Sequence, residues 1–226
     1  MSIHDGHRNR MKQRFLEDGL DRFDEVQALE LLLFYCIPRQ DTNELAHRLI
    51  DRFGSFASVL EAGYGELKKV PGVGDGAATF LPLLMETSRY YGVNKQKDQK
   101  ILHSVEDCGA YLVPYFHGRK NETVFMLCMD AKCKVLCCKE VGEGSVNSAA
   151  VPIRRIVQMA LSANATSVIL AHNHPSGLAL PSGEDVQTTQ NLAAALDAVE
   201  IMLVDHIIVS DDDYVSLAQS GLYAGK

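Results

Sequence analysis

The sequence has no apolar run that approaches the ~20 residues required for a membrane-spanning helix. The best candidate, residues 29–37, is far too short and contains Glu30. The N-terminal segment MSIHDGHRNRMKQRF is polar and mixed in charge, and it lacks the apolar stretch of a secretory signal peptide. We therefore expect no membrane association and a location in the cytoplasm.

An excess of basic residues is also missing. The formal net charge of the 226 residues is −7, and residues 1–92 and 93–226 each carry more acidic than basic side chains. A protein that binds nucleic acid by neutralising many phosphates normally has a basic surface. The charge therefore argues against extensive nucleic-acid binding, although it is compatible with a small local phosphate contact.

The six cysteines include no CxxC pair. Without an export signal, we expect no oxidising compartment in which disulfides would form. Cys133, Cys137 and Cys138 have the spacing C-x3-CC, which in principle could bind a metal. We favour the more common role of such cysteines as small hydrophobic residues in a strand hairpin.

Proline and glycine are too few for a disordered chain, and 46% of the residues are hydrophobic. The length suggests one or two domains. Residues 1–92 show apolar side chains at helical spacing and no strand-like alternation. Residues 93–100, VNKQKDQK, are polar and lack periodicity, so we predict a linker there.

After the linker, predicted strands are mixed with predicted helices. Strands are expected over 123–129, 134–141, 167–171, 202–210 and 214–217, and helices over 152–163 and 185–199. The sequence therefore predicts a smaller all-α N-terminal domain over 1–92 and an α/β (α+β) domain over 101–226.

The segment HNHPSG, which begins at His172, directly follows a predicted buried strand. Residues i and i+2 of an extended chain point to the same side, so the imidazoles of His172 and His174 converge. The chain then turns, and Asp185 at the start of the next predicted helix can bring a carboxylate to the same point. Two histidines and an aspartate are good ligands for Zn²⁺, and three protein ligands leave a position for water, as in catalytic zinc sites.

A polar loop with two incidental histidines is the alternative interpretation. Ser182 would then be the N-cap of the helix, and Asp185 would sit in the first turn, where the helix dipole favours an acid. This alternative does not explain two histidines at the end of an apolar strand. Asp205 and His206, on a later predicted strand, fit either a hydrogen-bond partner of a ligating histidine or a satisfied core pair.

The spacing H-x-H-x7-S-x2-D, formed by His172, His174, Ser182 and Asp185, resembles the JAMM motif of the MPN (JAB1/MPN/Mov34) metalloprotease family. The segments HNHPSG, LVDHIIVS and YVSLAQSGL resemble its bacterial RadC-like branch, and the resemblance covers almost the whole chain. It implies an MPN/JAB-type domain with a mixed sheet and one Zn²⁺ per chain, held by His172, His174 and Asp185. It also implies cleavage of an amide bond in a peptide or protein substrate.

The same resemblance implies two catalytic roles. Glu122, just ahead of the predicted strand 123–129, looks like the family's general base. Its alternative is a solvated residue at a strand start, and Glu140 and Glu143 are weaker rivals. Ser182 would donate a hydrogen bond to the tetrahedral oxyanion, or would only cap the helix. Arg155 departs from the RadC-like pattern, which often has an acid there, but the metal set is intact.

The run from Leu67 to Ala78 contains a PGVG turn and resembles a helix-hairpin-helix motif, which in its family binds the DNA backbone without reading sequence. The glycines permit a tight turn, and free N–H groups at the start of the following helix suit a phosphate. Lys68 and Lys69 lie nearby. Weak contact with the DNA backbone and a role in packing or protein binding are equally compatible with this pattern.

Two further functions stay open beside a metallopeptidase. A DNA-associated repair or accessory protein of the RadC type could use the metal for structure or regulation, and a metal-dependent hydrolase could act on a substrate other than a peptide. The ligand pattern favours metal-activated water, whereas the amide bond rests on the family resemblance alone. The sequence leaves the oligomeric state open.

Overall fold

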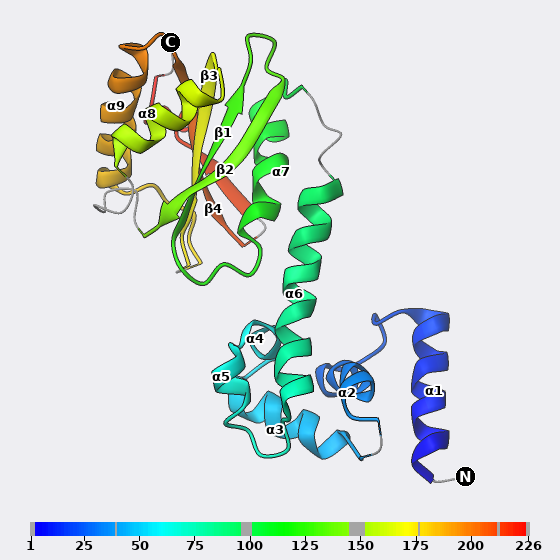
Figure 1. Ribbon diagram of the computed structural model, residues 1–226. Helices are drawn as coiled ribbons and strands as arrows, with labels where there is room; N and C mark the ends of the chain where they lie inside the picture. The colour runs from blue at the N-terminus through cyan, green and yellow to red at the C-terminus, as the bar shows by residue number, and fades with distance from the viewer. Residues whose placement is uncertain are drawn as a thin grey trace. The chain divides into compact units, whose positions relative to one another are not determined.

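The computed structural model describes residues 3–38, 40–95, 101–144, 152–175, 177–211 and 213–224. The chain separates into two compact units, Met1–Ser88 and Arg89–Lys226 (Figure 1). The first unit is helical in its described part, and the second contains a sheet with helices on both faces. Among the described residues, no helix is long and apolar enough to cross a membrane.

The helical unit contains α1 (Ile3–Asp18), α2 (Glu25–Cys36), α3 (Asn43–Phe53), α4 (Phe56–Glu61), α5 (Tyr64–Leu67) and most of α6 (Asp75–Lys95). Asp24 starts α2 through a capping box with Gln27, and Gly54, with a φ of 92°, ends α3. Leucines of α2, α3, α5 and α6 form the centre of the core: Leu29, Leu33, Leu45, Leu49, Leu67 and Leu81. The all-α N-terminal region predicted from the sequence is confirmed.

Helix α6 is longer than the sequence predicts. Residues 93–95, assigned above to the linker, form its last turn, and residues 96–100 lie outside the described part of the chain. Nothing in residues 93–95 breaks a helix. Gly92 also lies close to Pro114 of α7 (Val105–Phe116), since an added Cβ would come within 3.1 Å of the Pro114 Cβ. This contact with a neighbouring helix explains why α6 continues where its own pattern fades.

The second unit is built on one mixed sheet. Its strands are β1 (Thr123–Met129), β2 (Val135–Glu143), β3 (Ser167–Asn173), β4 (Met202–Ser210) and β5 (Asp213–Ser216). They lie in the order β2-β1-β3-β4-β5, with β3 and β4 parallel and the other neighbours antiparallel. The predicted mixed α/β fold is therefore confirmed.

Three helices cover the two faces of the sheet. Helices α8 (Ile153–Ser162) and α9 (Gly183–Asp197) lie on one face and α7 on the other (Figure 1). Side chains of β3 alternate between two cores: Val168 and Leu170 pack with α8 and α9, whereas Ile169 and Ala171 pack with α7. The sequence did not predict α7, which Ser104 caps by accepting a hydrogen bond from the Asp107 backbone N–H.

The cysteines of the β1–β2 hairpin do not converge. Adjacent residues on a strand point to opposite faces, so Cys137 packs with the core under α8 and α9, whereas Cys138 packs with the core under α7. Cys133 is exposed in the turn, and all six cysteines are free thiols. The C-x3-CC spacing therefore does not form a metal site here.

Strand register brings the start of β1 next to the end of β3. Val124 lies opposite His172 in this antiparallel pair. Glu122, two residues before Val124, is therefore at the same edge of the sheet as His174, two residues after His172. The pairing joins residues 48 positions apart in the sequence and sets the position of the candidate site.

Candidate metal centre

The predicted residues Glu122, His172, His174 and Asp185 lie together at this edge of the sheet. His172 is fully buried near the end of β3, and His174 follows where the chain leaves the strand. Asp185 is buried in the first turn of α9. Glu122 precedes β1, and 26% of its side chain is exposed. The site is thus formed by two strands and a helix N-terminus, with one partly open side.

The four side chains are gathered around the Nε2 atom of His172. This atom lies 2.9 Å from His174 Nε2, 3.3 Å from Asp185 Oδ1 and 3.9 Å from Glu122 Oε1. His174 Nε2 lies 3.8 Å from Asp185 Oδ2. One ligand atom each from Glu122, His172 and His174 lie within 4.8 Å of one another, a spacing that could hold a metal ion.

Hydrogen bonds behind the histidines indicate which ring nitrogens carry protons. The Nδ1 atom of His174 lies 3.1 Å from the carbonyl oxygen of Leu178. A carbonyl can only accept, so Nδ1 carries the proton and the Nε2 atom of neutral His174 carries a lone pair. This lone pair is directed at the cluster.

A buried chain of hydrogen bonds determines the tautomer of His172. The Thr189 hydroxyl donates to the carbonyl oxygen of Asp185 at 2.6 Å, so its oxygen accepts from the Nδ1 atom of His206, also at 2.6 Å. The Nε2 atom of His206 then accepts from the Nδ1 atom of His172 at 2.8 Å. His172 Nε2 is therefore left with a lone pair as well.

Burial keeps this chain neutral. Desolvation lowers the pKa of His172 to about 4, against the opposing effect of the Asp185 carboxylate. Desolvation also lowers the pKa of His206 well below its usual value. Both rings are therefore neutral at physiological pH, and neutral imidazole is the form that binds metal ions.

The resulting arrangement fits a cation. Two lone pairs face each other across 2.9 Å, and an Asp185 carboxylate oxygen lies 3.3 Å from one of them. Three electron-rich atoms at these distances repel one another unless a positive charge lies between them. Imidazole nitrogens with carboxylate oxygens are a donor set typical of zinc. The residues present therefore fit the metal implied by the sequence motif.

Ser182 is the N-cap of α9 and supports Asp185. Its hydroxyl donates to Asp185 Oδ2 at 2.6 Å and accepts from the Asp185 backbone N–H at 3.1 Å. The Ser182 backbone N–H also donates to Oδ2 at 2.8 Å. The contacts of Ser182 are therefore those of a helix N-cap. They hold the Asp185 carboxylate with its Oδ1 atom towards His172.

The remaining acidic candidates have other partners. The Arg119 guanidinium binds Glu140 at 2.9 Å and approaches Glu143 at 4.0 Å. The group with metal-binding spacing comprises Glu122, His172 and His174, and Asp185 joins the site through the 3.3 Å approach of its Oδ1 to His172 Nε2. Asp205 accepts hydrogen bonds from the Ser216 hydroxyl and from backbone N–H groups, so it stabilises the turn after β5. Of the pair left open by the sequence, only His206 contacts the candidate site.

Thr189 was missed by the sequence analysis, although a signal for it exists. It follows Asp185 by four residues, which places both on one face of α9. A threonine four residues after a candidate ligand is common in helices, however, and becomes informative only when His206 is known to lie beside it. That contact spans 17 residues and depends on how β4 packs against α9.

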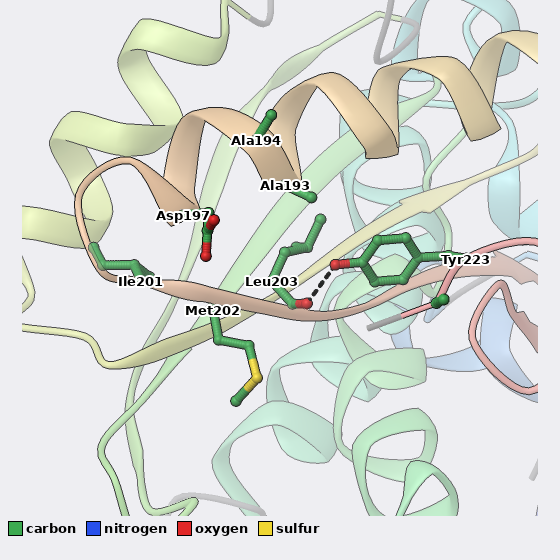
Figure 2. Close-up of a pocket in the computed structure, with 8 residues that line it drawn as sticks. Ala193, Ala194, Asp197, Ile201, Met202, Leu203 and Tyr223 are labelled. Carbon is green, nitrogen blue, oxygen red and sulfur yellow. Dashed lines mark hydrogen bonds between the residues drawn. The ribbon is translucent and has the colours of Figure 1, made fainter. Parts of the chain in front are cut away.

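A cavity of about 280 Å³ lies elsewhere in this unit, between the C-terminal part of α9 and the start of β4. Its lining is mainly apolar, and the hydroxyl of one lining residue, Tyr223, donates to the carbonyl oxygen of another, Leu203, at 2.7 Å (Figure 2). Asp197 adds a carboxylate to the lining. None of its lining residues belongs to the histidine cluster.

Comparison with known proteins gives matches that cover most of the chain. Residues 102–222 match the family described as the RadC-like JAB domain. A UPF0758 protein of Paraburkholderia xenovorans is 35% identical over 210 residues, which cover 93% of this chain and 83% of the relative. A UPF0758 protein of Fusobacterium nucleatum is 33% identical over 227 residues, covering 96% of this chain and 97% of the relative. The similarity to these relatives includes the helical unit as well as the sheet.

Proposed function

The chain belongs to the RadC-like JAB family, and from this premise we propose that it is a zinc-dependent hydrolase that cleaves an amide bond in a peptide or protein. The convergence of the Nε2 atoms of His172 and His174 beside a buried carboxylate carries the proposal. One Zn²⁺ per chain would be held by His172, His174 and Asp185. Three protein ligands leave a coordination position open, which is the pattern of catalytic zinc sites rather than structural ones.

Glu122 is proposed as the general base. When bound, Zn²⁺ lowers the pKa of a water ligand towards ~7 and polarises a carbonyl. The Glu122 carboxylate is partly exposed and lies 3.9 Å from His172 Nε2, so it can accept a proton from water at this edge and return it to the leaving amine. Its position beside the ligands rather than among buried side chains supports this role.

Ser182 has two proposed roles that compete for one proton. Its hydroxyl donates to Asp185 Oδ2, and in this orientation it holds a ligand. Donation to a tetrahedral oxyanion, as in the family pattern, would require the hydroxyl to turn away from Asp185. The two roles therefore predict different effects on metal affinity and on rate.

A second candidate function concerns the helical unit, which is proposed to contact the DNA backbone weakly. The turn before α6 is tight, with Gly72 exposed at a φ of 97°, and this supports a helix-hairpin-helix interpretation. The nearby cations are partly neutralised, because Lys68 binds Asp75 at 2.8 Å and Lys69 binds Glu66. Any contact with phosphate would therefore be weak and sensitive to salt.

Metal content tests the first step of the proposal. The purified protein should contain about one zinc per chain, and the double variant His172→Ala/His174→Ala should contain almost none. Zinc removal with a chelator should leave the fold intact, because the sheet has cores of its own and does not depend on metal as a zinc finger does. Full zinc content in the double variant would contradict the assigned ligands.

Glu122→Gln tests the chemistry apart from binding. A panel of peptides and isopeptide-linked conjugates is first screened to find a substrate. The variant should retain zinc and fold, and its hydrolysis rate should fall by roughly 10²–10⁴-fold, because an amide cannot accept the proton. Glu140→Gln is the matched control and should retain wild-type activity. Hydrolysis that survives complete zinc removal would disprove the mechanism.

A further inference from the structure

We propose that Asn173, the residue between the two candidate ligands, is a positioning residue for Glu122. The inference rests on the proposed function of Glu122 as general base. Asn173 does not face the metal centre. Successive side chains on a strand point to opposite faces, so His172 and His174 are directed towards the cluster and Asn173 is directed away from it.

The side chain of Asn173 bridges β3 to the segment that carries Glu122. Its Oδ1 atom accepts a hydrogen bond from the Thr123 backbone N–H at 2.7 Å. Its Nδ2 atom donates to the carbonyl oxygens of Asn121 at 3.3 Å and Arg119 at 3.4 Å. The residue is 5% exposed. The peptide groups on both sides of Glu122 are therefore bound by one buried amide.

These bonds replace the strand ladder where it ends. The last described β1–β3 pair is Val124 with His172, so one more step would place Thr123 opposite Asn173. There the side chain, rather than the backbone, bonds to the neighbouring segment. On the other side of the segment, the Gly144 backbone N–H donates to the Glu122 carbonyl oxygen at 2.7 Å. Glu122 is thus held from β3 and from the end of β2.

Only a carboxamide satisfies all three partners. One backbone N–H needs an acceptor and two carbonyl oxygens need donors, and the Asn side chain supplies both from one planar group. Aspartate would turn a charged oxygen towards two carbonyl oxygens, and leucine would leave all three backbone groups, including the buried Thr123 N–H, without this partner. Residues 172–174 therefore position the two candidate ligands from one face of the strand and Glu122 from the other face.

The test compares Asn173→Leu and Asn173→Asp in the full-length protein. Asn191→Asp, on the exposed surface of α9, is the matched control. Zinc content should equal that of the wild type in all three variants, because no ligand atom changes. The amide proton of Thr123 should exchange roughly tenfold faster in Asn173→Leu, since its hydrogen bond is lost. This measurement requires neither a substrate nor bound zinc.

Kinetics separates positioning from general damage. Either Asn173 variant should lower kcat by roughly 10–100-fold with little change in KM, because the base is displaced but the substrate still binds. In a Glu122→Gln background the same substitutions should cause almost no further loss. An equal loss of kcat with and without the Glu122 carboxylate would overturn the inference.

Failure of the hydrolase proposal can be distinguished from failure of this inference. A protein that binds no zinc and cleaves nothing would disprove the proposed function, whereas Thr123 exchange would still report whether Asn173 holds the segment. Unchanged exchange of the Thr123 amide in a folded Asn173→Leu variant would overturn the inference by itself. If that variant does not fold, Asn173→Asp is tested by kinetics instead. It keeps an acceptor for the Thr123 N–H but loses both donors to Asn121 and Arg119, and an unchanged kcat in this variant would overturn the inference.

Discussion

Helices α6 and α9 each have an aspartate in the first turn, and these two aspartates have opposite environments. Asp75 at the start of α6 is 80% exposed, and its carboxylate binds Lys68 and the Tyr64 hydroxyl. Asp185 at the start of α9 is 5% exposed, and its carboxylate lies between Ser182 and the lone pair of His172. The helix dipole favours both residues in the same way. Asp75 is exposed and forms a solvated ion pair. Asp185 is buried beside the end of β3, and this makes it a candidate ligand.

The two sites also differ in how their charges are balanced. Lys68 and the Tyr64 hydroxyl lower the pKa of Asp75, but the group is open to water and its ion pair is screened. Around Asp185, hydrogen bonds satisfy the outer atoms of the site and leave electron-rich atoms facing inward. The charges of the surface pair balance each other, whereas the buried cluster has a spacing that could hold a metal ion. This difference makes the buried cluster the candidate binding site.

The largest expected difference is between Asp185→Asn and Asp75→Asn. A neutral amide is a poorer ligand than a carboxylate, so Asp185→Asn should weaken zinc binding by at least about 100-fold, more than the loss of an outer-sphere partner. Asp75→Asn should leave zinc binding unchanged. Competition with a chromophoric chelator measures both affinities, and equal affinities in the two variants would remove Asp185 from the ligand set.

A smaller difference is expected when the support of His172 is removed. Thr189→Val deletes the hydroxyl that orients His206, and zinc affinity should fall by roughly 10–100-fold while the fold is retained. Thr87→Val is the control, because the Thr87 hydroxyl also donates to a carbonyl four residues earlier, but on the exposed surface of α6. The same loss of zinc affinity in both variants would show that the buried chain has no specific role.

The two serine caps of the sheet unit allow a finer comparison. Ser182→Ala and Ser104→Ala each remove a side chain that accepts a backbone hydrogen bond at a helix start, and each should lower the free energy of unfolding by about 1 kcal/mol. Only Ser182→Ala should also weaken zinc binding. A rate loss of roughly 10²–10³-fold in Ser182→Ala with unchanged zinc affinity would instead favour the oxyanion role.

The smallest effect is expected at Lys68, which lies between α5 and the turn before α6. Lys68→Ala should leave zinc content and activity unchanged and should weaken the binding of duplex DNA at low salt by a few-fold, reducing the salt slope by about one. Fluorescence anisotropy with a short labelled duplex measures this. Binding that does not depend on salt, or that is the same in Lys68→Ala, would argue against a phosphate contact at this turn.

Much of the architecture could be predicted from the sequence because it depends on local patterns. Apolar alternation and helical spacing predicted the mixed sheet and the helical N-terminal region, and the HNHPSG segment indicated the metal centre. Helix α7 was missed, although Ser104 is a typical N-cap and the buried residues Cys108, Tyr111, Leu112 and Phe116 are at helical spacing, because Gly109 and Pro114 inside it are unfavourable in a helix. Gly109 is explained only by its neighbour in space: an added Cβ would come within 2.2 Å of the Tyr214 ring.

The sequence by itself determined which residues are able to bind a metal, because spacing along a strand and at a helix start is a local property. The tertiary structure decided how they are used. The strand register brought Glu122 to His174, the packing of β4 on α9 joined His206 to Thr189, and the end of the β1–β3 ladder gave Asn173 its partners. These contacts join residues 17 to 54 positions apart. Periodicity does not encode them, because they depend on which buried donors and acceptors meet once the chain has folded.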